Sequence, residues 1–161
     1  MKHIALNFLK FVLIVVALLL MIIGIFGVPS FIRSMRINGV DFGIWRLIFG
    51  ITIYPAILLF LMALYQAFRL LGYIRWQKTF TQMAVVTLNH IKKETMTVTG
   101  LLYVAFLPVA YMIADDGDAP GLIIFAFLFA SAPLVIGIFA YVMEMLLKEA
   151  IAIKTENELT V

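Results

Sequence analysis

Residues 119–143 read APGLIIFAFLFASAPLVIGIFAYVM and hold 25 consecutive positions without a charged side chain. A helix that crosses about 30 Å of hydrocarbon needs roughly 20 predominantly apolar residues. Because this stretch is longer than that, it predicts a membrane-spanning helix.

Three more stretches share this character. Residues 11–32, 47–68 and 95–114 are uncharged over 22, 22 and 20 positions. The whole chain is 65% hydrophobic and 13% charged, whereas soluble domains are roughly 45–50% apolar and about 25% charged. The composition excludes a soluble enzyme, a disordered chain and a nucleic-acid-binding domain, so no direct binding of nucleic acid is expected.

The predicted fold is all-α, a single membrane domain over 1–161 with four transmembrane helices in an antiparallel bundle. The expected spans cover about 11–28, 47–68, 95–114 and 121–143. The Gly27-Val28-Pro29-Ser30 cluster is expected to end the first span, and Asn38-Gly39 to form a turn. The first apolar run is longer than the roughly 7–15 residues of a signal peptide, which predicts an uncleaved span.

The connection between the second and third spans is expected to contain an amphipathic helix over 79–94. Thr79 with Gln82 fits a capping box, and apolar residues then recur at helical spacing as far as Ile91. Such a helix either rests on the headgroups or the bundle, or binds anionic lipid or a protein partner.

Charge sets the expected orientation. Nine of the 12 Lys and Arg residues lie on the side of the two termini and the 69–94 connection, and three lie on the other side. Positive charge gathers in cytoplasmic loops. We therefore expect a multi-pass protein of the bacterial inner membrane with both termini in the cytoplasm.

The sequence predicts no catalytic, cofactor-binding or metal site. It has no cysteine and only two histidines, His3 and His90, which are isolated from each other. Glu144, at the inner end of the fourth span, is expected within reach of water. The few polar residues inside the spans are expected to form hydrogen bonds between helices; they are Thr52, Gln66, Thr97, Thr99, Tyr103, Tyr111 and Ser131.

Two patterns yield candidate contacts. The acidic turn of Asp115, Asp116 and Asp118 is either a site that senses an external cation or peptide, or ordinary turn chemistry, since its spacing does not match a calcium-binding loop. A stripe of small residues marks one face of the fourth span and favours close helix packing, within the bundle or in a homo-oligomer. It consists of Ala126, Ala130, Pro133, Gly137 and Ala140.

Three stretches together resemble a known family. They are YQAFRLL at 65–71 leading to Phe80, DAPG at 118–121, and the ending at 147–161 with Leu147-Lys148, Ala150-Ile151, Ile153-Lys154 and ENELTV. The chain is similar to the YoaS-like family of small bacterial membrane proteins. The resemblance implies four spanning helices, no catalytic residues, and genes that often lie beside one for a helix-turn-helix regulator of the Cro/repressor type.

The leading hypothesis is a non-enzymatic membrane partner of a cytosolic helix-turn-helix transcription regulator, with 72–94 and 148–161 as the contact elements. Apolar residues among the charges of the tail are the candidate partner contacts: Leu147, Ile151, Ile153, Leu159 and Val161. The alternatives are a small transporter, channel or membrane-perturbation factor, and a purely structural subunit in the lipid bilayer.

Reporter fusions test the topology. Fusions after Val161 and within 72–90 should report a cytoplasmic location, and a fusion within 115–118 an external one, because of the Lys and Arg asymmetry. An external C-terminus would contradict the four-span arrangement.

Overall fold

The computed structural model describes residues 2–37, 42–75 and 81–159, which are almost entirely helical. In chain order the elements are α1 (Lys2–Ile22), a π-helical turn η1 (Ile23–Gly27), α2 (Val28–Ile37), α3 (Gly43–Arg75), α4 (Gln82–Asp116) and α5 (Gly121–Leu159). Four long apolar stretches are candidate membrane spans, as the sequence predicts: Ile4–Met35, Gly43–Tyr73, Gln82–Asp116 and Gly121–Asn157.

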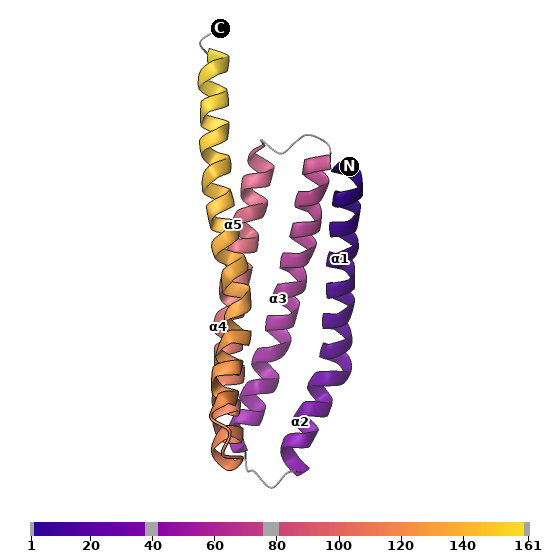
Figure 1. Ribbon diagram of the computed structural model, residues 1–161, viewed down its shortest axis with the longest axis vertical. Coiled ribbons are helices and arrows are strands. Elements are labelled where there is room, and N and C mark those ends of the chain that lie inside the picture. The colour runs from indigo at the N-terminus through magenta and orange to yellow at the C-terminus, as the bar shows by residue number, and fades with distance from the viewer. Residues whose placement is uncertain (1, 38–41, 76–80, 160–161) are drawn as a thin grey trace.

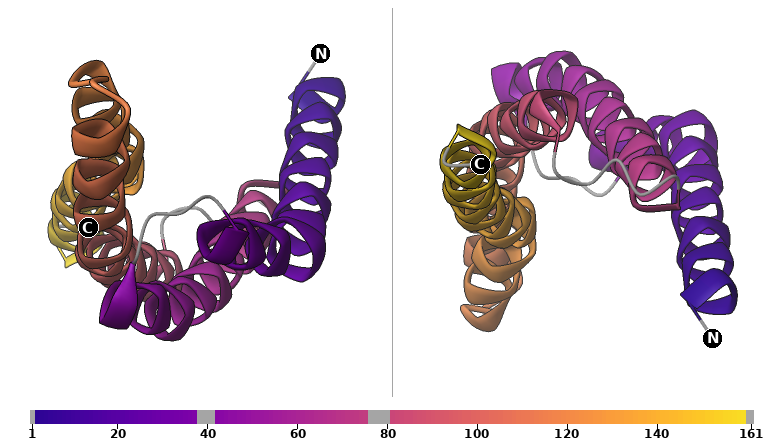
Figure 2. Two further views of the ribbon diagram at one scale, coloured as in Figure 1. Left: turned by 90° about the horizontal axis from the view of Figure 1, so that it is seen from below. Right: turned by 90° about the horizontal axis from the view of Figure 1, so that it is seen from above.

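The helices follow one another as antiparallel neighbours in an open, curved layer (Figures 1 and 2). α1 packs on α3, α3 on α4, and α4 on α5, so α4 is covered on two sides. α1 and α5 form the two edges of the layer. A closed bundle is not required in a membrane, because apolar side faces lose nothing by touching lipid tails.

The helix does not end at the Gly27-Val28-Pro29-Ser30 cluster but continues to Ile37. The backbone N–H of Val28 donates to the carbonyl of Ile23, one residue further back than in an α-helix. Pro29 follows in the first turn of α2, where a missing N–H costs little. The wider turn therefore carries the helix past the Gly-Val-Pro cluster. The Asn38-Gly39 turn lies outside the described residues.

The amphipathic helix predicted over 79–94 is not a separate element. From Gln82 onward it is the first part of α4, and no Gly or Pro separates Gln82 from the apolar run that follows. Most of its apolar stripe is buried in the protein, with Leu88 and Ile91 packed beside Ala140 of α5, whereas Met83 is exposed. Thr79 lies outside the described residues, and Thr81 precedes α4 without a capping side-chain hydrogen bond.

The small residues of α5 lie where α5 meets α4. Ala126, Ala130, Pro133, Gly137 and Ala140 are all buried. A Cβ added at Gly137 would lie 2.7 Å from Oγ1 of Thr95 in α4. Thr95 is itself fully buried, and its hydroxyl donates to the Ile91 carbonyl at 2.8 Å. The structure thus uses this stripe for a close approach within one chain.

An aromatic series links the helices across the curved layer. The ring centroids of Phe31 and Phe49 are 5.4 Å apart, those of Phe49 and Phe106 also 5.4 Å, and those of Phe106 and Phe129 5.5 Å. These rings come from α2, α3, α4 and α5 in turn. They line an apolar groove of about 490 Å³ that receives side chains from all four spans and therefore lies on the concave side.

Gly137→Ala should lower the stability of the protein in detergent by on the order of 1–3 kcal/mol, because the added methyl overpacks the contact with Thr95. Thermal unfolding measures the change. Gly100→Ala in α4 is the matched control, since nothing lies within 4 Å of a Cβ there. Equal effects at the two sites would contradict the close approach.

Candidate functional site

Polar side chains gather near the end of the layer where both chain termini lie. Here they bridge α3 to α4 and α4 to α5. We call this set the polar belt, and its members are Gln66, Asn89, Lys92, Glu94, Glu144 and Lys148.

Glu144 is the centre of the belt, and only 3% of its surface is exposed. Its Oε2 accepts from Lys92 Nζ at 2.7 Å, and its Oε1 from Lys148 Nζ at 2.7 Å. Asn89 Nδ2 donates to the same Oε1 at 3.1 Å. Three donors from two helices therefore satisfy one buried carboxylate, as a buried charge requires.

The sequence explains how Glu144 reaches this position. It continues the spacing of three and four residues that runs through Gly137 and Ala140, so it faces α4 as they do. Lys148 follows one turn later on the same face. The expectation that Glu144 lies within reach of water is wrong, because α4 continues beside it and brings Lys92 over its carboxylate. The spacing of three and four residues that continues from Gly137 and Ala140 to Glu144 is the sequence signal that could have identified this buried position.

The contact between α3 and α4 is less complete. Gln66 Nε2 donates to Glu94 Oε1 at 2.6 Å. Gln66 Oε1 and Glu94 Oε2 are buried and have no hydrogen-bond partner within the described part of the chain. Buried acceptors without donors cost free energy, on the order of 1–3 kcal/mol each. The belt therefore holds α5 on α4 more firmly than α4 on α3.

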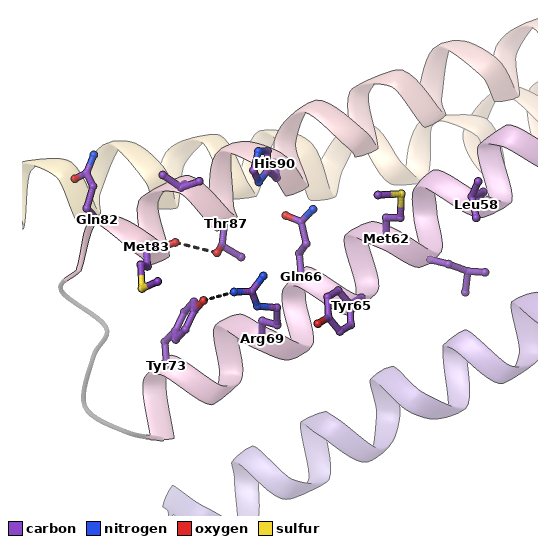
Figure 3. A pocket seen from close by; sticks show the side chains of 12 residues that line it. Leu58, Met62, Tyr65, Gln66, Arg69, Tyr73, Gln82, Met83, Thr87 and His90 are labelled. Atoms are coloured by element: carbon purple, nitrogen blue, oxygen red, sulfur yellow. Dashed lines mark hydrogen bonds between the residues drawn. The ribbon is translucent and has the colours of Figure 1, made fainter.

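A groove opens beside the belt between α3 and α4, with a volume of about 570 Å³ (Figure 3). We call it the α3–α4 groove. Its lining includes Leu58, Met62, Tyr65, Gln66, Arg69 and Tyr73 of α3 and Gln82, Met83, Thr87 and His90 of α4. Arg69 Nη2 donates to Tyr73 Oη at 2.9 Å. His90, expected as a polar residue of a surface helix, faces this groove.

The spanning hydroxyl groups behave only partly as expected. Thr52, Thr97 and Thr99 bond to carbonyls of their own helices, at 2.7, 2.9 and 2.9 Å. The carbonyl four residues back is the nearest acceptor for a helical threonine. A hydrogen bond of 2.8 Å between Tyr103 and Ser131 does join α4 to α5.

The acidic turn is exposed at the other end of the layer. Asp115 and Asp116 close α4, and Asp118 adopts a positive φ of 48°. Among the described residues no group of three or more His, Cys, Asp or Glu side chains is placed to hold a metal ion.

The candidate partner contacts of the tail have different environments. Leu147 packs beside Leu88 and Ile91, and Ile151 is half-buried. Ile153 is 61% exposed. Leu159 is the last residue of α5, and Val161 lies outside the described residues.

Comparison with known proteins gives two matches. Residues 41–161 match the family described as "Protein of unknown function (DUF2975)". The chain is 37% identical over 161 residues, 100% of both proteins, to the "Uncharacterized membrane protein YoaS" of Bacillus subtilis (strain 168). No solved structure matches at a significant level.

Glu144→Gln should lower the thermal stability in detergent by about 1–3 kcal/mol, because it leaves Lys92 and Lys148 without a counter-charge. Glu94→Gln is the contrasting variant. Its new amide adds a donor beside the unpartnered Gln66 oxygen, so stability should stay the same or rise. Equal losses in the two variants would contradict the difference between the two contacts.

Proposed function

Since the chain belongs to the DUF2975 family, we propose that it is a non-enzymatic membrane protein that binds a cytosolic helix-turn-helix transcription regulator. The family resemblance supports this partner through the gene neighbourhood that it implies. The structural support is the part of α5 that extends beyond its neighbours.

In this proposal the end with both termini faces the cytoplasm of a bacterial cell. The nine Lys and Arg residues on that side of the spans support the orientation. The acidic turn of Asp115, Asp116 and Asp118 is then external, where it stays available for a cation or peptide signal.

The extension of α5 is the observation that carries the proposal. α5 has 39 residues, about 58 Å at 1.5 Å per residue, and so exceeds the hydrocarbon thickness about twofold. Asn89 of α4 contacts Glu144 of the antiparallel α5. Gln82, the first residue of α4, is seven residues from Asn89, so it lies level with Ile151, which is seven residues from Glu144. Residues 152–157 continue past that level and are exposed (Figure 1).

The chemistry of this extension suits a regulated protein contact. Ile153 is an exposed apolar residue on a helix that also carries Lys154 and Glu156. An apolar centre within a polar rim is the usual composition of a non-obligate interface. The Glu144 network fixes the base of the helix, so the partner meets an element that is already ordered, which reduces the entropy lost on binding.

The transporter or channel alternative receives less support. A solute pathway calls for polar groups along a cavity in the membrane. The groove on the concave side is lined instead by apolar residues such as Leu20, Ile53, Phe106 and Ile136.

Deleting residues 155–161 should leave membrane insertion intact, because the four spans determine it. The deletion should abolish co-purification with a helix-turn-helix regulator encoded beside the gene, and change expression of that regulator's targets. Ile153→Ala should weaken the same binding. Leu146→Ala is the matched control, since Leu146 is 49% exposed on the same helix but lies before the extension. Unchanged binding and expression at normal protein levels would contradict the role of the tail.

A further inference from the structure

The α3–α4 groove has two chemically different ends. Leu58, Leu61 and Met62 make one end apolar. At the other end Arg69 and Tyr73 of α3 lie opposite Met83 and Thr87 of α4 (Figure 3), and Gln82 and His90 also line the groove. A site with this gradient fits a molecule that is itself apolar at one end and polar at the other.

The gradient runs in the direction of the membrane normal. Arg69 lies one turn beyond Gln66, a member of the polar belt, and toward the termini. Leu58 lies eight residues from Gln66 in the other direction, about 12 Å deeper along the helix. Tyr65, which is 62% exposed, stands between the two ends, and tyrosine favours the level of the headgroups. The groove therefore crosses the boundary between headgroups and hydrocarbon.

The polar end is suited to a negative charge. Arg69 is exposed, and its guanidinium is oriented by the 2.9 Å hydrogen bond from Nη2 to Tyr73 Oη and by a distance of 5.9 Å to the centroid of that ring. The planar guanidinium presents paired N–H donors that match phosphate oxygens. Glu94, whose Oε1 accepts from the Gln66 amide, is not among the residues that line the groove.

We propose that the α3–α4 groove binds an anionic phospholipid, with the phosphate at Arg69 and an acyl chain along Leu58 and Met62. The position of the cation at the headgroup level, directly above an apolar floor, carries this assignment. Basic sites between spanning helices are known to hold anionic headgroups in this way. The inference is independent of any protein partner and does not depend on the orientation in the membrane.

The test uses the full-length protein, delipidated in a neutral detergent. Thermal unfolding is followed while phosphatidylglycerol, phosphatidylcholine or glycerol 3-phosphate is added. Phosphatidylglycerol should raise the melting temperature at low ratios of lipid to protein. Phosphatidylcholine, which has no net charge, should raise it much less. Glycerol 3-phosphate, which has the phosphate but no chain, should have little effect.

Variants locate the site. Arg69→Gln should weaken phosphatidylglycerol binding about tenfold, because it removes the charge-assisted hydrogen bonds to phosphate. Arg33→Gln is the matched control, since Arg33 is an exposed cation on α2 far from the groove. Native mass spectrometry should show bound phosphatidylglycerol on the wild type and on the Arg33 variant, but less on the Arg69 variant.

Three results would overturn the proposal. Equal stabilisation by the two phospholipids would indicate non-specific lipid contact. Equal losses in the two arginine variants would indicate general attraction between charges. Stabilisation by glycerol 3-phosphate equal to that by phosphatidylglycerol would indicate a site for a soluble anion.

Discussion

The buried carboxylate of Glu144 is the interaction on which the arrangement of the helices depends. Two lysines and an asparagine surround it, and Lys92 and Asn89 belong to α4 while Lys148 belongs to α5. An ion in such a place is stabilising only when its partners stay in position. The network therefore sets the register of α5 on α4, and with it the direction and level at which the tail emerges.

Close backbone approach supports the same contact along the rest of its length. Lipid supplies no hydrophobic force that drives helices together, so association depends on packing and on hydrogen bonds between helices. The contact of Gly137 with Thr95 provides the close packing, and the pair of Tyr103 and Ser131 provides a hydrogen bond between helices. On the α3 side, the Gln66–Glu94 contact leaves two acceptors unpartnered, and the α3–α4 groove opens beside it. The firm contact thus supports the protruding helix, and the looser one leaves room for a ligand.

The sequence predicts the spans well because hydrocarbon excludes charge, and this constraint acts on every residue of a spanning helix. Glycine and proline residues, which often interrupt helices, predicted the helix ends less well. Gly27 and Pro29 did not end a helix, because a π-helical turn accommodates them. The first part of α4 is amphipathic as expected, but Ala84, Leu88 and Ile91 on its apolar side are buried in the protein. Periodicity gives the face of a helix and not what covers it.

The polar belt was harder to predict, since its contacts join residues far apart in the chain. Glu144 could have been assigned to the α4 face from its spacing to Gly137 and Ala140. Its pairing with Lys92 could not be predicted, because the pairing depends on the register between α4 and α5. The groove lining combines Arg69 with His90 for the same reason. Single residues and their helix faces are readable from sequence, while pairs across helices need the fold.

The most direct test of the Glu144–Lys92 ion pair is a double-mutant cycle between Lys92→Met and Glu144→Met, measured by unfolding of the purified protein in detergent. If the two side chains form the ion pair that sets α5 on α4, the double variant should be more stable than the sum of the single losses predicts. The coupling free energy should be about 1–3 kcal/mol. If the two losses of stability simply add, within about 0.5 kcal/mol, then Glu144 and Lys92 do not stabilise each other. That result would contradict the role of this ion pair in setting α5 on α4.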